Sequence, residues 1–378
     1  MHLAPLLALT VALAASALHA ENLITWQRVA LNDKFYAESA NFADINRDGK
    51  TDIISGPFWY EGPDWQKKHA FYEPKAFDIN GYSDNFFVYP HDFNADGWLD
   101  LLVLGFPGKE ARVYLNPGTF TEDKPWTMHV VADVVDNESP TFADVTGDGL
   151  PELVCGRDGY IGWYEVTEHP RDKWWFMTCH PAPVGMAKFT HGLGVGDVNG
   201  DGKNDVLEAR RWWQQPTDLR IHEVPFAGKF MGYQFDQHNF AAGVGGGAQM
   251  FAYDFDGNGT NDVFTALAAH RYGVAVYLQN KTAPTVKTSH GVATVTREFK
   301  LGPDGKEISG SAVDFTGPAW TRILLASENP ADNDYGIVFS QPHAAHLADI
   351  NGDGIQDIVT GKRYWAHNGH DPDERGAR

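Results

Sequence analysis

The chain has 378 residues, with 39 glycines, 21 prolines and 13% aromatic residues, and it lacks long helical periods after the first twenty residues. This composition indicates a turn-rich, all-β protein that is long enough for a large core. The formal net charge of −20 argues against nucleic acid as a partner, because phosphate contacts need clustered Lys and Arg.

The first twenty residues, 1–20, are predicted to be a secretory signal peptide. The apolar segment Leu3–Leu18 is too short to span a membrane, and cleavage is expected after Ala17 or Ala20. A buried N-terminal helix is the alternative. The prediction places the mature protein, a single domain over 21–378 with no membrane span, outside the cytoplasm, either secreted or periplasmic.

Six nine-residue loops share carboxylate or amide oxygens at positions 1, 5 and 9, and five of them also at position 3, where the third loop has Thr146. Glycine at position 6 of each loop allows a tight turn. Hard oxygen ligands are what Ca²⁺ takes, and the loops hold 18 of the 50 acidic residues. The predicted calcium ligands are Asp44, Asn46, Asp48, Asp52, Asp92, Asn94, Asp96, Asp100, Asp144, Asp148, Glu152, Asp197, Asn199, Asp201, Asp205, Asp254, Asp256, Asn258, Asp262, Asp349, Asn351, Asp353 and Asp357.

These loops are expected to hold up to six structural Ca²⁺ ions. The alternative is six turns without metal, because Asp, Asn and Gly also form ordinary turns. EF-hand loops are excluded, since position 12 is acidic in only one of the six and short β-branched runs follow the loops instead of helices.

The loop starts are 48, 52, 53, 57 and 95 residues apart, a period typical of a β-propeller. We predict six recognisable four-stranded blades, with each acidic loop between the first and second strands. Examples of the four strand types are expected at 191–196 and 343–348 (first), 205–209 (second), 111–115, 160–164 and 274–278 (third), and 126–131 and 174–178 (fourth).

Three features stand apart from the repeat. The segment Ile24–Ala30 resembles a fourth strand without a loop before it, and it is predicted to complete the last blade and close the ring. The 95-residue gap is interpreted as an insertion at about 280–317 in the fifth blade, with a decayed loop at Asp314–Trp320 as the alternative.

Cys155 and Cys179 fall on strands that are not neighbours, roughly 9–10 Å apart, so both are expected to be buried free thiols.

The loops resemble those of FG-GAP and VCBS-repeat propellers. Longer stretches resemble secreted bacterial VCBS-repeat proteins related to the propeller domain of fungal aldos-2-ulose dehydratase. The resemblance implies seven blades in the parent architecture, so that either this chain is truncated or its ring closes with six blades. The stretches that carry the resemblance are 189–197, 247–251, 269–273, 339–343 and 360–367.

The starts of the first strands and the turns between second and third strands are expected on the face opposite the loops. Three imidazoles there suit a transition metal such as Zn²⁺ or acid–base chemistry, and aromatic rings and planar cations suit sugars and carboxylates. The residues of this face are Arg157, His191, Arg210, Arg211, Trp212, Trp213, Gln249, His270, Arg271, Tyr272, His343, Lys362, Arg363 and Tyr364.

Aldos-2-ulose dehydratase eliminates water from a keto-sugar, so the resemblance implies a carbon–oxygen lyase that dehydrates an oxidised sugar or glycoside. It also implies the candidate catalytic residues. The alternatives are a non-catalytic propeller that binds carbohydrate or a partner protein, and a purely structural adhesion unit. The candidates are His191, His270 and His343 as base or metal ligands, and Arg211, Arg271 and Lys362 as holders of an oxyanion or carboxylate.

Overall fold

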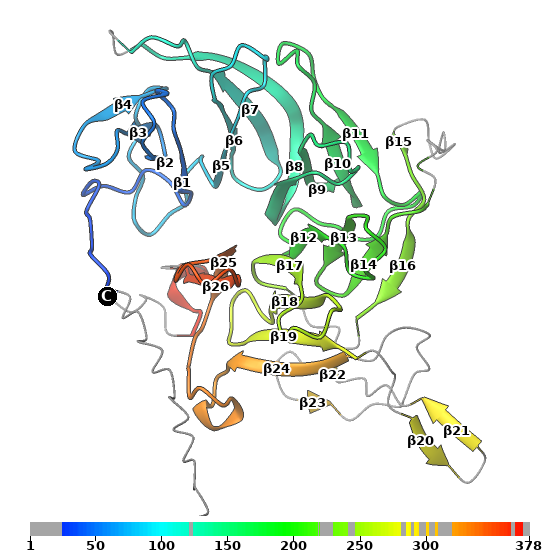
Figure 1. Cartoon of the computed structure of the whole chain (residues 1–378). Coiled ribbons are helices and arrows are strands. Elements are labelled where there is room, and N and C mark those ends of the chain that lie inside the picture. Colours follow the sequence, from blue (N-terminus) through cyan, green and yellow to red (C-terminus); the bar gives the residue numbers. More distant parts are fainter. Residues whose placement is uncertain are drawn as a thin grey trace, which may run out of the picture.

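Figure 1 shows the computed structural model of the chain, in which curved β-sheets follow one another around a central space. The predicted signal peptide, 1–20, lies outside the residues that the structure describes. No helix among the described residues is long and apolar enough to cross a membrane. The described residues are 25–120, 124–217, 219, 230–240, 246–280, 285–288, 291–294, 300–301, 307–308, 320–363 and 367–372.

The first sheet is an antiparallel meander in the order β1-β2-β3-β4. The acidic loop that starts at Asp44 connects β1 to β2, as predicted for the first two strands of a blade. Branched and aromatic side chains favour strands, and Ile54 and Trp59 of this sheet are fully buried. The strands are β1 (Asn41–Ala43), β2 (Asp52–Ser55), β3 (Phe58–Tyr60) and β4 (Lys68–Ala70).

Two further four-stranded units are joined in one sheet, in the order β15-β11-β10-β9-β8-β7-β6-β5. Strand β8 (Thr127–Ala143) is the fourth strand of one unit and the first strand of the next. Its register shifts between Asp136 and Thr141, within the part that pairs with β9. The other strands are β5 (Phe87–His91), β6 (Asp100–Leu104), β7 (Lys109–Leu115), β9 (Glu152–Arg157), β10 (Tyr160–Glu165), β11 (Trp175–Thr178) and β15 (Met231–Gly232).

Two more units form a second large sheet, in the order β16-β14-β13-β12-β17-β18-β19-β24. Their first strands, β12 and β17, run in parallel, and Gly194 lies opposite Met250. The glycine permits this approach, because a Cβ at Gly194 would lie 2.0 Å from the Met250 carbonyl oxygen. The strands are β12 (Leu193–Gly196), β13 (Asp205–Glu208), β14 (Arg211–Gln214), β16 (Asp236–Asn239), β17 (Gln249–Tyr253), β18 (Asp262–Ala266), β19 (Val274–Gln279) and β24 (Trp320–Ala326).

The last sheet of the described residues pairs β25 with β26. The segment interpreted as an insertion, about 280–317, connects β19 to β24, which pair as the third and fourth strands of their unit. The remaining elements are β20 (Thr285–Thr288), β21 (Gly291–Thr294), β22 (Lys300–Leu301), β23 (Glu307–Ile308), the short 3₁₀ turn η1 (Pro330–Asp332), β25 (Pro342–Ala348), β26 (Asp357–Lys362) and the 3₁₀ turn η2 (His367–Gly369).

Hydrophobic cores lie between neighbouring units. One cluster joins Leu102 on β6 to Leu153 on β9, and another joins Trp163 on β10 to Trp213 on β14. These units therefore pack face to face against their neighbours, as the blades of a propeller do. The part of the chain that the structure describes is all-β and β-propeller-like, as predicted.

The prediction of a strand at Ile24–Ala30 is wrong for the part that is described. Residues 25–30 form no strand, and Trp26 is 80% exposed. A strand needs the hydrogen-bonding edge of a neighbour. Among the described residues the last sheet ends at β26, so a third strand on which a fourth could pair is lacking there.

The two cysteines are buried and free, as predicted. Gly162 on β10 lies opposite Cys155 on one side and opposite Thr178, the neighbour of Cys179, on the other. A whole strand therefore separates the two thiols, which places them beyond the reach of a disulfide bond.

Candidate functional site

The acidic loops are turns built from side-chain-to-backbone hydrogen bonds. In the loop that starts at Asp197, the first carboxylate accepts hydrogen bonds from the amides of Asp201 (3.1 Å) and Gly202 (2.8 Å). The last carboxylate, Asp205, is fully buried and accepts from the amides of Val198 and Gln215, each at 2.9 Å. Burial raises the pKa of Asp205 to about 7. One buried carboxyl group on the second strand thus holds both the loop and the end of the third strand through hydrogen bonds.

Two of the loops bring three acidic side chains to one point. One ligand oxygen from each residue lies within 4.8 Å of the other two in the group Asp144, Asp148 and Glu152. The same holds for Asp254, Asp256 and Asp262. Hard oxygen donors at this spacing fit a Ca²⁺ ion, which takes six to eight of them.

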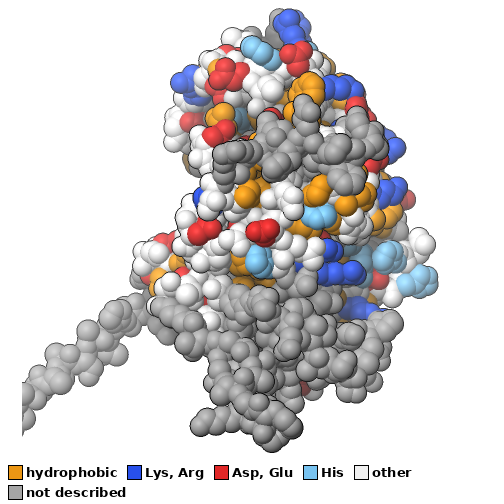
Figure 2. Space-filling view, turned by 90° about the vertical axis from the view of Figure 1, so that its right-hand side faces the viewer, with side chains coloured by type: hydrophobic (Ala, Val, Ile, Leu, Met, Phe, Trp, Pro, Cys, Tyr) orange, Lys and Arg blue, Asp and Glu red, His pale blue; other side chains and the backbone are white. Residues whose placement is uncertain are grey.

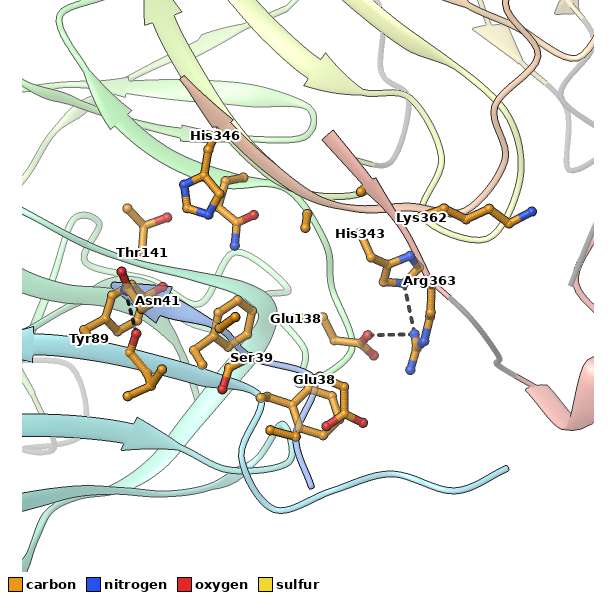
Figure 3. A pocket seen from close by; sticks show the side chains of 18 of the residues that line it. Glu38, Ser39, Asn41, Tyr89, Glu138, Thr141, His343, His346, Lys362 and Arg363 are labelled. Carbon is orange, nitrogen blue, oxygen red and sulfur yellow. Dashed lines mark hydrogen bonds and ion pairs between the residues drawn. The ribbon is translucent and has the colours of Figure 1, made fainter. Parts of the chain in front are cut away.

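A cavity of about 840 Å³ lies among the units. Figure 3 shows side chains that line it. The first strand of every unit contributes to its wall. The strands do so through, among others, Asn41, Val88, Thr141, Val195, Met250 and Ala344. The cavity therefore runs along the axis around which the units are arranged.

The wall of the axial cavity offers mainly hydrocarbon and aromatic surface. Its polar side chains are partly bound to the protein itself, since Asn41 Nδ2 donates to the Val88 carbonyl and Tyr89 Oη donates to the Pro140 carbonyl, both at 2.8 Å. Three charged or titratable side chains, Glu138, His343 and Arg363, lie together in this wall, and we call this part of the cavity the histidine mouth. Figure 3 shows His343, Arg363 and Glu138 together there, with His346 away from them.

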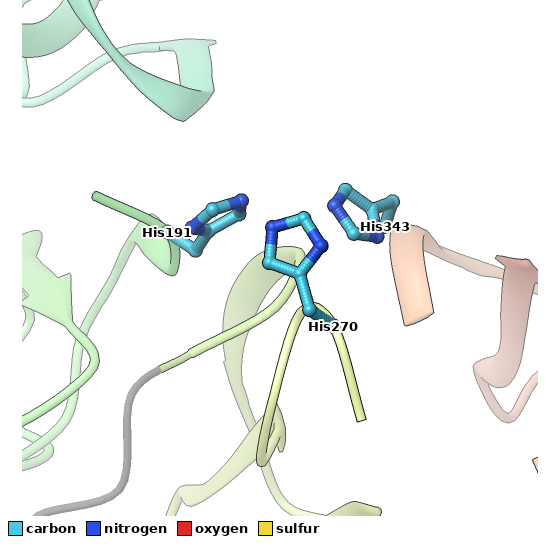
Figure 4. Close-up of side chains that lie close together, drawn as sticks. All are labelled: His191, His270 and His343. Carbon is cyan, nitrogen blue, oxygen red and sulfur yellow. The ribbon is translucent and has the colours of Figure 1, made fainter. Parts of the chain in front are cut away.

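Three histidines from three different units meet beside this mouth (Figure 4). His191 precedes β12, His270 lies in the turn between β18 and β19, and His343 is on β25. The ring centroids are 5.0 to 5.3 Å apart, and one nitrogen of each ring lies within 4.8 Å of the other two. The structure thus brings together the three histidines that the sequence singled out, and we call them the histidine triad.

Hydrogen bonds assign the tautomer of His343. Its Nδ1 lies 3.2 Å from the Gln341 carbonyl, which only accepts, and its Nε2 lies 2.9 Å from the guanidinium of Arg363, which only donates. The ring is therefore neutral, with the proton on Nδ1. Burial and the charge of Arg363 lower the pKa of His343 well below its ordinary value, so this imidazole keeps a lone pair on Nε2 at neutral pH.

Glu138 is a charged partner of the triad that the sequence analysis missed. Its Oε2 lies 3.0 Å from His191 Nε2 and 3.4 Å from Arg363 Nη1. Burial raises the pKa of Glu138, but the neighbouring His191 and Arg363 outweigh this effect and lower it overall. His191 Nε2 is buried, and its contact with Glu138 is close but not aligned as a hydrogen bond.

A sequence signal for Glu138 does exist. His191 and His343 each stand six residues before the first Asp of their loops, Asp197 and Asp349, and Glu138 stands six residues before Asp144. Equivalent positions of repeated units meet around the axis. The register of the repeat alone would therefore have placed Glu138 beside the two histidines.

The predicted cationic residues are not equally close to the triad. Lys362 lines the cavity, and its Nζ donates to Ser340 Oγ at 2.8 Å. Arg271 is exposed. Arg211 lies on β14, where it pairs with Glu208 and covers the ring of Trp213, 5.4 Å from the ring centroid.

The predicted aromatic residues of this face also differ in position. Trp212 and Trp213 are almost fully buried, at 3% and 0% exposure, so they pack between sheets and offer no platform for a sugar. Arg157 is stacked on aromatic rings, with Tyr164 5.7 Å away. Tyr364 lies outside the described residues. Figure 2 shows His side chains beside Lys and Arg side chains on the described surface.

Comparison with known proteins finds FG-GAP-like repeats in this chain. The model of the FG-GAP-like repeat matches residues 92–155 and 144–208, which contain the second, third and fourth acidic loops in full. A search of curated proteins gave no match.

Several solved structures are similar at low scores. An Agrocybe aegerita lectin specific for non-reducing terminal N-acetylglucosamine is 19% identical, with 85% of this chain and 73% of that chain covered and a TM-score of 0.42. The rhamnogalacturonan lyase YesW is 13% identical, with 86% and 69% covered and a TM-score of 0.39. The Vibrio cholerae biofilm matrix protein Bap1 is 15% identical, with 58% and 38% covered and a TM-score of 0.30. Scores this low carry no information about the activity of this chain.

Proposed function

We propose that this chain is a secreted or periplasmic, calcium-binding FG-GAP repeat propeller that performs β-elimination on an oxidised sugar or glycoside, as a carbon–oxygen lyase. One observation carries the proposal. His191, His270 and His343, which come from three different units, converge with Glu138 and Arg363 at the mouth of the axial cavity. Convergence of imidazoles, a carboxylate and a cation at a cavity is typical of a catalytic site.

The histidine triad offers a donor set for a transition metal such as Zn²⁺. Binding would require the guanidinium of Arg363 to move away from Nε2 of His343, whose lone pair now accepts its hydrogen bond. Three imidazoles are a known donor set for catalytic zinc, which keeps a fourth position open. Nε2 of His191 supports this assignment, because it is buried and makes no aligned hydrogen bond, although the carboxylate of Glu138 lies 3.0 Å away. When bound, such an ion supplies a Lewis acid that polarises the substrate carbonyl.

The other groups of the mouth supply proton transfer and charge. Glu138 is held as a carboxylate, and it would accept the proton from the carbon next to the carbonyl. Arg363 and Lys362 would face the oxygen that gains negative charge. The electron pair of the C–H bond would first move onto the carbonyl oxygen as an enolate, and its return would form the new double bond as the C–O bond breaks. The leaving oxygen would take a proton from water, and the hydroxide that remains would take back the proton held by Glu138.

The axial cavity supports a glycoside as the substrate class. A cavity of about 840 Å³ lies in the range that holds a ligand of several rings. Its wall presents side chains such as Val88, Phe142 and Met250, which suit an apolar aglycone better than the hydroxyl groups of a second sugar. The oxidised sugar ring would then lie at the histidine mouth.

The test is a screen of 2-keto and 3-keto sugars and their aryl glycosides for elimination products, with His343→Ala as the variant. We expect the wild type to form an unsaturated product and the variant to lose about 10²–10⁴-fold in rate. His346→Ala is the matched control, because His346 lies three residues further along the same strand and lines the same cavity. Equal rates in all three proteins, or no product from any keto-sugar, would refute the lyase.

A second candidate is a non-catalytic carbohydrate-binding propeller. The apolar and aromatic wall of the cavity favours it, because such a wall binds a glycoside even where no bond is broken. In that case His343→Ala would still bind aryl glycosides as the wild type does in calorimetry, and no product would appear.

A further inference from the structure

Asp371, near the C-terminal end of the described residues, contacts the histidine triad from outside. Its Oδ2 lies 2.8 Å from Nδ1 of His270, and its Oδ1 lies 3.0 Å from Nδ1 of His367. An ionised carboxylate only accepts hydrogen bonds. The nitrogen of His270 that faces Asp371 therefore carries the proton, and Nε2 of His270 keeps its lone pair.

Gln341 fastens the segment of Asp371 to the triad. Its side-chain Nε2 donates to the carbonyl of Pro372, the residue after Asp371, at 2.9 Å. Its backbone amide donates at 2.6 Å to the carbonyl of Arg271, the residue after His270. Its own carbonyl accepts from Nδ1 of His343. One residue thus links the surroundings of two triad histidines to the segment that carries Asp371.

The backbone conformation of Gln341 indicates that its surroundings hold this residue in place. Gln341 is fully buried, and its φ of 54° lies in the left-handed region that residues with a Cβ rarely adopt. Such conformations persist only where the surrounding structure holds them. The carbonyl of Pro372 also accepts from Ser340 Oγ at 3.2 Å, so the position of Asp371 relative to His270 is fixed from two sides.

We propose that Asp371 is the positioning residue of the triad, holding His270 in the orientation and tautomer that present Nε2 to a metal ion; this inference rests on the metal centre of the proposed function. A carboxylate that receives the second N–H of a histidine ligand both fixes the ring and raises its basicity. Asp371 is 101 residues from His270 in the chain, which hides the pair from sequence patterns.

The experiment compares metal binding by the full chain and by Asp371→Ala, Asp371→Asn and His367→Ala. Zinc is titrated into metal-free protein by calorimetry, and cobalt by visible absorption. We expect Asp371→Ala to bind Zn²⁺ about 10- to 100-fold more weakly. Asp371→Asn recovers most of the affinity, because its amide oxygen still accepts the hydrogen bond from Nδ1. His367→Ala, which removes the other partner of the same carboxylate, keeps both the affinity and a stoichiometry of one.

A second measurement needs no metal. The nitrogen chemical shifts of the His270 ring report its tautomer. The wild type should show the Nδ1–H form, and Asp371→Ala should lose it. Far-ultraviolet circular dichroism verifies that each variant is folded. Unchanged tautomer and unchanged zinc affinity in Asp371→Ala would overturn the inference. A fall from two zinc ions to one in His367→Ala would also overturn it, because His270, His367 and Asp371 lie close enough to ligate an ion themselves.

The same data separate this inference from the proposed function. If the wild type binds no transition metal, the metal centre fails, and with it the role of Asp371 as a support of a ligand. If the wild type binds zinc and Asp371→Ala binds it equally well, only the positioning role fails.

Discussion

At the scale of single residues, burial decides which polar groups can react. Burial raises the pKa of the Cys155 thiol well above its ordinary value, and it raises the pKa of Cys179 in the same direction. Only a thiolate attacks a thiol reagent at a useful rate. The two cysteines should therefore react with a thiol reagent only when the core between units opens.

Both cysteines should therefore be inert in the native protein. We expect an aromatic disulfide reagent to release two equivalents of thiolate from protein in denaturant and almost none, over the same time, from native protein at pH 8. Ser139→Cys, a buried position, and Thr127→Cys, an exposed position on β8, serve as references for closed and accessible sites. Rapid reaction of the native wild type would show that its core opens.

At the scale of elements, close backbone contacts at glycine determine how the first strands of neighbouring units pack. The parallel pairing of β12 with β17 brings Leu193, two residues after His191, opposite Gln249, which lines the cavity. Strand β8 carries Glu138 to the same cavity. It does so because it continues without interruption from the fourth strand of one unit into the first strand of the next. Strand pairing between units thus sets the geometry of the mouth.

Gly194→Ala tests this arrangement. The new Cβ would meet the Met250 carbonyl at 2.0 Å, and relieving such a clash costs about 1–3 kcal/mol or more. We expect the midpoint of denaturant unfolding to fall accordingly. Gly361→Ala on β26 is the control, because its Cβ would meet Ala344 at an ordinary distance of 3.5 Å. Equal loss of stability in both variants would mean that the parallel pairing is not constrained at Gly194.

At the scale of the whole molecule, the units enclose a space that none of them contains alone. Acidic loops follow the C-terminal ends of the first strands, and the triad gathers at their beginnings. Metal at the loops would therefore stabilise the units that carry the site without touching the chemistry. Because the loops and the triad lie at opposite ends of the first strands, the two proposed kinds of metal can be tested independently.

Calcium removal tests the support. A ligand that binds only the folded state stabilises it by about 2.7 kcal/mol per site when its free concentration is 100 times Kd. We expect a calcium-selective chelator to lower the melting temperature, and Asp148→Ala to lower the number of ions bound by one, since Asp148 belongs to a loop with three converging carboxylates. A melting curve that does not change in excess chelator would identify the loops as ordinary turns.

The sequence alone determined the all-β class, the strands around the acidic loops and the candidate role of His191 and His343, because these depend on spacing that repeats along the chain. Only the tertiary structure decided three other matters: that residues 25–30 form no strand, that Arg211 on β14 pairs with Glu208, and that Asp371 contacts His270. The physical reason is that local spacing sets which side of a strand a residue occupies, whereas contacts between residues as much as 101 positions apart arise only when the units pack around their axis.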